Sequence, residues 1–211
     1  VFPEPKKLDA MMKKVSRESG IAYSTQQEQA IREAVGSGLL LITGGPGTGK
    51  TTILNGILSL FAQMDLKCVL AAPTGRAAKR LTEVTGQDAS TIHRLLEAGI
   101  DPATGDMFFA KDENNPLKAD AVIVDEMSMV DLSIAYKLFK SVSNTSKIVL
   151  VGDAEQLPSV GAGNVFFDIL NSGCVEVTKL DTVFRQSGTS RIALNAESIR
   201  NNETTLLYGS D

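Results

Sequence analysis

The sequence predicts an α/β fold: a parallel sheet flanked by helices on both faces, with a small inserted β-hairpin. Short apolar runs alternate with helical stretches along the chain, which is the pattern of a doubly wound sheet. The runs are apolar throughout, as expected for strands covered on both faces. A glycine-rich loop follows the first core strand. The predicted strands are Leu39–Thr43, Lys67–Ala71, Ala121–Asp125, Ile148–Gly152 and Cys174–Thr178.

The bulk composition fits a single globular domain. A length of 211 residues, with 43% apolar and 22% charged residues, suits one large α/β domain with an insertion. The net charge of −4 does not indicate a nucleic-acid partner, so any such binding must come from local contacts. No apolar run approaches the roughly 20 residues of a membrane helix, and the start lacks a signal-peptide layout. Cys68 and Cys174 lie beside apolar runs, and we interpret both as buried, reduced thiols of a cytoplasmic protein.

Two helices are expected before the first core strand. Residues 1–22 form a polar lead-in with a short amphipathic helix around Leu8 to Val15, which we interpret as a linker remnant. A second helix should run from Thr25 to Val35, with Ser24 as its N-cap, and the sequence Gly-Ser-Gly at 36–38 ends it. The domain proper is therefore predicted over residues 23–211.

One segment between the later helices breaks the alternation. An Asp-Pro pair followed by Thr-Gly-Asp, within residues 101–106, is typical of a tight turn between short strands. We predict a hairpin insertion over about residues 97–117, and a plain surface loop is the alternative. The helices expected between strands are Thr51–Met64, Thr74–Glu83, Leu132–Ser141 and Val165–Asn171.

The glycine-rich loop is a G-x-x-x-x-G-K-T element between a strand and a helix, the context of a P-loop NTPase. Its glycines allow several backbone N–H groups to converge on phosphate oxygens, and the helix N-terminus favours the same anion. Lys50 would contact the β- and γ-phosphates, and the Thr51 hydroxyl would help to hold Mg²⁺. The predicted nucleotide contacts are Gly45, Pro46, Gly47, Thr48, Gly49, Lys50, Thr51 and Thr52.

Acidic and amide side chains follow two other strands at the same edge of the sheet. Asp125 is assigned to Mg²⁺, and Glu126 to the water that attacks the γ-phosphate. Acidic residues often cap strand ends, but their pairing with the glycine-rich loop favours the catalytic interpretation. Gln156 could bond the γ-phosphate or its attacking water. Asp153 is as readily explained as a turn former.

The ordered motifs resemble those of superfamily 1B DNA helicases of the RecD/TraA family, which includes exodeoxyribonuclease V alpha subunits. The resemblance covers about residues 20–200 and implies a first RecA-like motor domain that uses ATP and Mg²⁺. It also implies binding to single-stranded DNA and duplex junctions, 5′→3′ travel, and roles in repair or recombination, and it leaves open whether the protein works alone or in a nuclease complex. The motifs are TQQEQA, GGPGTGKTT, APTGRAAKRL, TIHRLL, VIVDEMSMVD, LVGDAEQLPSVGAGNVF and DTVFRQ.

The resemblance assigns two further residues to the ATP site. Gln27 matches the glutamine that recognises adenine in such helicases, with Gln26 as the adjacent competitor. Without the resemblance, Gln27 would be read as an exposed polar residue on a helix. Arg185 matches an arginine directed at the γ-phosphate, and Gln186 would position it. The implied catalytic set is therefore Lys50, Glu126, Gln156 and Arg185.

The resemblance also implies contacts with single-stranded DNA. A helix N-terminus at Thr74 can bind a DNA phosphate through its N–H groups without a basic surface. An exposed salt bridge is an equal alternative for Arg76, and a structural role is the alternative for His93. The hairpin would act as a pin, with Phe108 and Phe109 on its apolar face, although hairpin packing explains them as well. The expected DNA contacts are Pro73, Thr74, Gly75, Arg76, Thr91 and His93.

The motifs of a second motor domain have no counterpart in the sequence. We therefore expect a monomeric fragment that binds Mg-ATP weakly and hydrolyses it poorly, because half of the site would be absent. The alternatives are an ATP-dependent switch or clamp that does not translocate, and a small-molecule kinase. A clamp would not need the DNA motifs, and a kinase would carry an arginine-rich lid.

Overall fold

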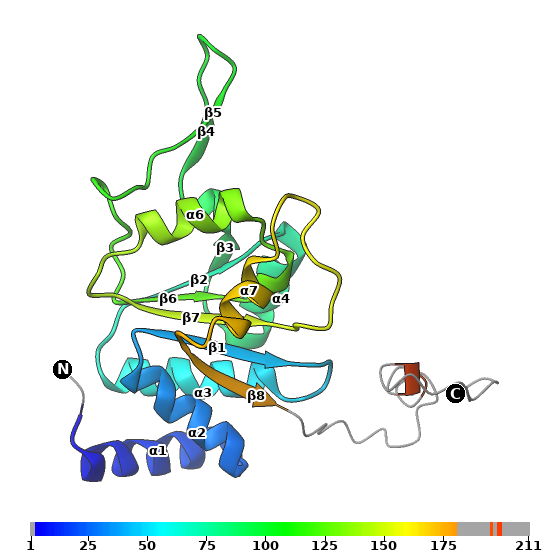
Figure 1. The fold of residues 1–211 in the computed structure, drawn as a ribbon. Coiled ribbons are helices and arrows are strands. Elements are labelled where there is room, and N and C mark those ends of the chain that lie inside the picture. Colours follow the sequence, from blue (N-terminus) through cyan, green and yellow to red (C-terminus); the bar gives the residue numbers. More distant parts are fainter. Residues whose placement is uncertain (1–2, 181–194, 196–197, 200–211) are drawn as a thin grey trace.

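The computed structural model describes residues 3–180, 195 and 198–199, and the account below is confined to them. Six parallel strands form the central sheet in the order β3-β2-β6-β7-β1-β8 (Figure 1). The strong strands β1, β2, β6 and β7 lie within one or two residues of their predicted positions. The strands are β1 (Leu39–Gly44), β2 (Cys68–Ala72), β3 (Ala89–Thr91), β6 (Ala121–Val124), β7 (Lys147–Gly152) and β8 (Glu176–Leu180).

Helices cover both faces of this sheet, as the sequence predicts. Alternate residues of β1 supply the two cores, because Leu40 and Ile42 belong to one buried cluster and Leu41 to the other. The first face carries α1 (Pro5–Ser19), α2 (Thr25–Gly36), α3 (Lys50–Gln63) and α4 (Gly75–Thr85). The second face carries α5 (Ile92–Leu95), the short 3₁₀ helix η1 (Met127–Met129), α6 (Leu132–Ser141) and α7 (Val165–Asn171).

Helix α1 is longer and better packed than the expected lead-in. Leu8, Met11, Met12 and Val15 recur at helical spacing and are buried in the core cluster of the first face. An ion pair of 2.7 Å between Arg32 and Asp9 joins α1 to α2. The expectation of a linker remnant therefore does not fit residues 5–19, which are part of the folded domain.

The inserted hairpin consists of β4 (Ala98–Ile100) and β5 (Met107–Phe109), which pair antiparallel and project from the domain (Figure 1). The ring of Phe108 lies over Gly99, its cross-strand partner, where an added Cβ would be 2.6 Å from the ring. Phe109 packs against the second core instead. Phe108 therefore packs within the hairpin and Phe109 against the domain, on opposite sides of β5.

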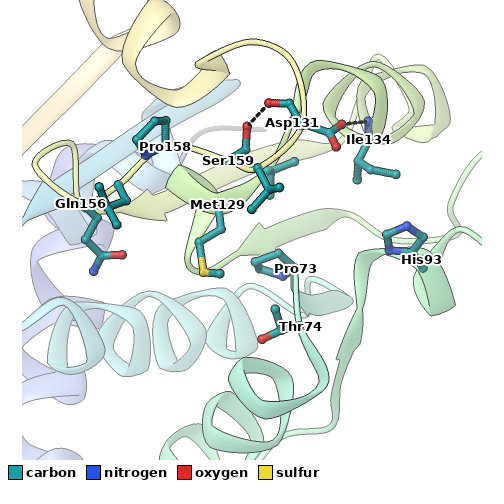
Figure 2. Close-up of a pocket in the computed structure, with 13 residues that line it drawn as sticks. Pro73, Thr74, His93, Met129, Asp131, Ile134, Gln156, Pro158 and Ser159 are labelled. Atoms are coloured by element: carbon teal, nitrogen blue, oxygen red, sulfur yellow. Dashed lines mark hydrogen bonds between the residues drawn. The ribbon is translucent and has the colours of Figure 1, made fainter.

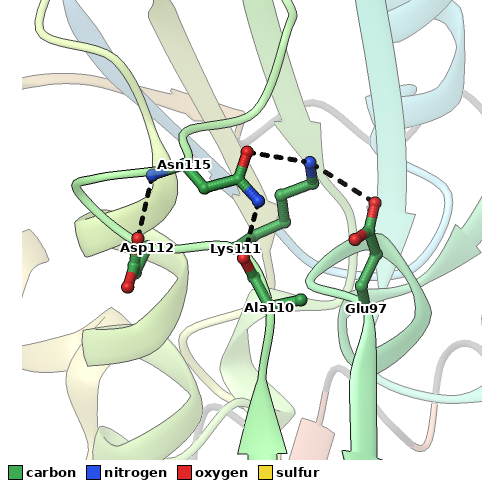
Figure 3. A network of polar contacts seen from close by, with 5 residues as sticks. All are labelled: Glu97, Ala110, Lys111, Asp112 and Asn115. Atoms are coloured by element: carbon green, nitrogen blue, oxygen red, sulfur yellow. Dashed lines mark hydrogen bonds and ion pairs between the residues drawn. The ribbon is translucent and has the colours of Figure 1, made fainter.

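Polar contacts close the base of the hairpin (Figure 3). Lys111 forms a 3.4 Å ion pair with Glu97, the residue directly before β4. The Asn115 side chain donates to the carbonyl of Ala110 at 2.8 Å, and the carboxylate of Asp112 accepts from the Asn115 N–H at 2.9 Å. The ion pair ties the chain that leaves β5 to the chain that enters β4, and the two Asn115 contacts fold the leaving chain onto itself.

Two sequence expectations need correction. The edge strand β3 was not predicted, because its three residues are only half-buried and lack an apolar run. The cysteines are both free, as expected, but Cys68 is half-buried and Cys174 is exposed. Burial, followed by the nearby charge of Asp120, raises the pKa of the Cys68 thiol to about 11.

Across the described ranges, no helix has the length and apolarity needed to cross a membrane.

Candidate functional site

The glycine-rich loop joins the end of β1 to the start of α3. Gly47 and Gly49 have φ angles of +82° and +88°, a region that favours glycine, and Gly49 is the N-cap of α3. Gly44 is equally constrained, because a Cβ there would lie 2.6 Å from the Thr48 hydroxyl oxygen. The sequence therefore folds into a tight loop whose helix N-terminus faces a cavity.

Most of the predicted nucleotide contacts line this cavity of 380 Å³. Thr48 is the exception within the loop, because its buried hydroxyl donates to the Gly45 carbonyl at 2.9 Å. The ammonium group of Lys50 donates to the carbonyls of Gly44 and Gly45, at 3.1 Å to the latter. The lining residues from the loop and α3 are Gly45, Pro46, Gly47, Gly49, Lys50, Thr51 and Thr52.

Asp125 and Glu126 bring two carboxyl groups to the same cavity from the end of β6. The Glu126 N–H donates to the Asp125 carboxylate at 2.9 Å. Glu126 has a φ of +54°, an uncommon conformation for a residue other than glycine. Such conformations cluster at functional sites, where the surrounding structure maintains them.

Burial raises the pKa of Asp125 above its usual value, although the N–H of Glu126 and the charges of Lys50 and Arg80 oppose that effect. Burial also raises the pKa of Glu126, and the neighbouring Asp125 charge adds to it, while Lys50 and Arg80 again act in the opposite direction. The cavity thus combines two carboxyl groups and two cations. A raised carboxyl pKa at a cavity is typical of groups that exchange protons in a functional site.

Gln156 reaches the cavity from the turn after β7, the strand between β1 and β6. Asp153 is buried and shapes this turn, because its carboxylate accepts from the Glu155 N–H at 3.0 Å and its carbonyl from the Gln156 N–H at 3.2 Å. The turn-forming interpretation of Asp153 therefore agrees with the structure, and through this turn Asp153 also positions Gln156.

Arg80, Leu81 and Val84 of α4 also line the cavity, and the sequence interpretation assigned none of them. A signal was present, since Arg76 and Arg80 are four residues apart in a predicted helix whose first turn was assigned to DNA. Side chains at that spacing lie on the same side of a helix.

Gln27 does not line the cavity. It is buried, and its side-chain oxygen accepts from the Ser24 N–H at 3.0 Å, while the Ser24 hydroxyl accepts from the Gln27 N–H. This reciprocal capping box starts α2 and confirms Ser24 as the N-cap. The structure therefore gives Gln27 a local structural role, and its contact with adenine stays a prediction.

A second, larger groove of 670 Å³ lies beside the cavity and shares Gln156 with it (Figure 2). Pro73, Thr74 and His93 line this groove, so three of the predicted DNA contacts meet there. The opposite wall was not anticipated from the sequence. It comes from η1, the start of α6 and the loop after β7, with the lining residues Met129, Val130, Asp131, Ile134, Leu157, Pro158, Ser159, Val160 and Gly161.

The remaining predicted DNA contacts lie near the groove without lining it. The Thr91 hydroxyl caps α5 by accepting from the Arg94 N–H at 3.2 Å. In the groove itself, the Thr74 hydroxyl caps α4 in the same way, by accepting from the Ala77 N–H at 3.2 Å. Gly75 is exposed, with open space where a Cβ would be. Arg76 is exposed and forms no ion pair with another described residue, which argues against the structural salt bridge. Arg185 and Gln186 lie outside the described residues.

The donor set at the cavity fits Mg²⁺ bound together with nucleotide phosphates. The Thr51 side chain and Asp125 line the same cavity. No group of three or more His, Cys, Asp or Glu side chains within residues 3–180 could hold a metal alone. Mg²⁺ commonly uses one or two protein oxygens and takes its other ligands from water and phosphate.

Comparison with known proteins identifies the family and the relatives of the chain. The model of the AAA domain family matches residues 27–162. The chain is 35% identical over 189 residues to the ATP-dependent RecD2 DNA helicase of Deinococcus radiodurans, covering 90% of this chain and 25% of the relative. It is 38% identical over 195 residues to the RecBCD enzyme subunit RecD of Mycolicibacterium smegmatis, covering 81% of this chain and 34% of the relative. The chain thus spans about a quarter to a third of these relatives.

A solved structure supports the fold independently. The crystal structure of the Pif1 helicase from Candida albicans matches with a TM-score of 0.55 and 23% identity, over 85% of this chain and 44% of that one. At this identity the likeness concerns the fold alone. It confirms the predicted RecA-like parallel sheet flanked by helices.

Proposed function

This chain belongs to the AAA domain family and is related over most of its length to RecD2 and RecD proteins, and we propose that it is the ATP-hydrolysing motor domain of a DNA helicase. One observation carries the proposal. The cavity that holds the phosphate loop and both carboxyl groups adjoins the groove that gathers Pro73, Thr74 and His93, and Gln156 lines both. Nucleotide and single-stranded DNA would therefore occupy neighbouring sites on one domain.

The loop residues would bind the phosphates of ATP. Lys50 now donates to the carbonyls of Gly44 and Gly45, and it would exchange these partners for the β- and γ-phosphate oxygens. Mg²⁺, held by Thr51 and Asp125, would neutralise the charge of the phosphates. Because Lys50 already lines the cavity, the exchange needs a side-chain movement and no rearrangement of the loop.

Hydrolysis would depend on the residues that follow β6 and β7. Glu126 would orient the attacking water and accept its proton, a role that suits a carboxylate with a raised pKa. Gln156 would bond the γ-phosphate or that water. By the resemblance, Arg185 would stabilise the charge of the transferred phosphoryl group, and Gln27 would contact the adenine.

The groove would bind the DNA backbone. The N-terminus of α4 presents N–H groups next to the exposed Thr74, which suits a DNA phosphate. Apolar residues of the opposite wall, such as Met129 and Leu157, offer contact surface for sugars or bases. Binding of this kind needs no basic surface, in agreement with the net charge of −4.

In the intact protein, we propose that hydrolysis drives 5′→3′ travel along one strand, with the hairpin at the duplex junction. A second motor domain would close on the nucleotide from the other side of the cavity. A cytoplasmic place and membership of a nuclease complex are further parts of the proposal, suggested by the RecBCD enzyme subunit RecD among the relatives.

The test is ATP hydrolysis by the intact protein with and without a single-stranded oligonucleotide. We expect DNA to stimulate turnover, and Lys50→Ala or Glu126→Gln to reduce it by at least about 100-fold. Lys137→Ala and Glu18→Gln, which change exposed residues outside both cavities, should leave turnover unchanged. Unaltered turnover in Lys50→Ala or Glu126→Gln would contradict the assigned roles.

A strand-displacement assay then separates a motor from a clamp. A helicase unwinds a tailed duplex with ATP, and Thr74→Ala and His93→Ala raise the oligonucleotide concentration needed for half-maximal stimulation. A protein whose ATP hydrolysis responds to DNA but which never displaces a strand would be a clamp. Hydrolysis that DNA does not affect would point away from both.

A further inference from the structure

Arg80 lines the cavity that contains the phosphate loop, although its helix begins at the groove that was assigned to DNA. Helix α4 begins at the groove with Thr74 as its N-cap and continues past the cavity that contains Lys50, Asp125 and Glu126. Arg80 lies in the second turn of this helix and lines the cavity. Asp125 and Glu126 line the same cavity, and the charge of Arg80 acts to lower the pKa of both carboxyl groups.

The position of Arg80 is fixed relative to the phosphate loop. Ala78 and Leu81, on either side of it in the helix, are 4% and 1% exposed and anchor α4 to the domain. The Asn55 side chain donates to the Val84 carbonyl at 3.0 Å, which joins α4 to α3, the helix that starts at Lys50. Arg80 and Lys50 are therefore carried by two helices that are directly connected.

Arg80 has no ionic partner within the part of the chain that the structure describes. Its neighbour Lys79 pairs with Glu83 at 4.0 Å, whereas Arg80 forms no ion pair and no side-chain hydrogen bond with those residues. A planar guanidinium group presents several N–H donors in a geometry that matches phosphate oxygens. A cation without a partner that lines a phosphate-binding cavity is suited to an anionic ligand.

The strand order decides which part of a nucleotide could reach it. Helix α4 follows β2, which lies beyond β6 on the side of the sheet away from β1 and β8. Helix α2, which carries Gln27, contacts β1 and β8 at the other side. With Gln27 on the base, as the proposed function has it, a nucleotide whose phosphates lie on the loop after β1 extends its terminal phosphate toward β6 and Arg80.

From this geometry we infer that Arg80 contacts the terminal phosphate of a bound nucleoside triphosphate. The inference rests on the proposed function, and it adds a second cation from within the domain to Lys50. A nucleoside diphosphate would leave Arg80 without a ligand. Arg80 therefore makes the cavity distinguish triphosphate from diphosphate.

The experiment compares the affinities of the 211-residue chain for Mg²⁺·ATPγS and Mg²⁺·ADP by isothermal titration calorimetry. Arg80→Ala should weaken ATPγS binding by at least about tenfold, the usual effect of losing a charge-assisted hydrogen bond, and change ADP binding by less than about twofold. Arg80→Lys should recover part of the loss, because it keeps the charge without the planar fork.

Lys79→Ala is the matched control, because it removes the adjacent cation, which pairs with Glu83 at 4.0 Å, from the same helix. It should alter neither affinity. Equal effects of Arg80→Ala on the two nucleotides, or none on ATPγS, would overturn the role of Arg80 and leave the proposed function standing. A wild-type chain that binds neither nucleotide would overturn both.

Discussion

Replacing Gly161 with alanine tests how the wall of the groove is built. Gly161 lies in the loop after β7, directly against Asp131, the N-cap of α6. An added Cβ would lie 2.4 Å from one carboxylate oxygen of Asp131 and 2.7 Å from its Cβ. The Asp131 side chain cannot simply turn away, because its other oxygen accepts from the Ile134 N–H at 2.9 Å.

The expected cost combines two effects. Forcing a methyl group into an already filled contact costs about 1–3 kcal/mol. Displacing Asp131 from its cap adds about 1 kcal/mol. We therefore expect Gly161→Ala to lower the free energy of unfolding by about 3 kcal/mol, a large share of the roughly 5–15 kcal/mol of a typical domain.

Urea unfolding followed by far-ultraviolet circular dichroism measures this change, since the chain contains no tryptophan. Gly38→Ala is the control, because a Cβ there meets nothing within 4 Å. Its stability should equal or slightly exceed that of the wild type. A double-mutant cycle isolates the contact: in an Asp131→Gly background, itself a mild change at an N-cap, Gly161→Ala should cost less than about 1 kcal/mol.

The reasoning would be refuted if Gly161→Ala cost the same in both backgrounds. It would also fail if the substitution left stability unchanged in the wild type. The same variant should weaken binding of a single-stranded oligonucleotide, because Gly161 and Asp131 both line the groove.

Two further predictions concern the cavity and helix α1. Burial raises the pKa of Asp125 from 3.8, so its contribution to folding is favourable below that pH and is lost as the pH rises through the higher folded-state value. At pH 7, without nucleotide, Asp125→Asn should therefore raise the urea midpoint of unfolding, and it should abolish ATP hydrolysis. The control Asp88→Asn, at an exposed residue, should change neither. A lower urea midpoint for Asp125→Asn would contradict the prediction. Met12→Ala, at a side chain that is 2% exposed, should lower the free energy of unfolding by about 2–3 kcal/mol. The control Lys13→Ala, at an exposed residue, should leave it unchanged. Equal free energies of unfolding for Met12→Ala and the wild type would mean that α1 contributes nothing to the domain.

The fold was largely predictable because its central strands are continuous apolar runs. Residues 39–43 and 148–152 could be recognised as strands without any long-range information, and the phosphate loop fixed their common edge. Strand β3 was missed because Ala89, Ser90 and Thr91 have no apolar pattern and pair with β2 along only one side. Cys174 was expected to be buried because it precedes an apolar run, but β8 begins two residues later, at Glu176.

The site was predictable where chemistry is local in sequence. Lys50, Thr51, Asp125 and Glu126 meet in one cavity because parallel strands bring their carboxyl ends to the same edge. The spacing from Arg76 indicated only the helix side of Arg80, because its place in the cavity depends on the packing of α4 on α3. The capping role of Gln27 was also hidden, since Ser24 was seen as a cap without its reciprocal partner.

The closed base of the hairpin has a mechanical consequence. The Lys111–Glu97 ion pair and the bond from Asn115 to the Ala110 carbonyl hold the root of a ribbon that is otherwise only two strands wide. Because these contacts hold its root, such a ribbon bends without separating from the domain. A load on the exposed tip is then passed to Phe109, whose ring centroid is 6.0 Å from that of His93 in the wall of the groove.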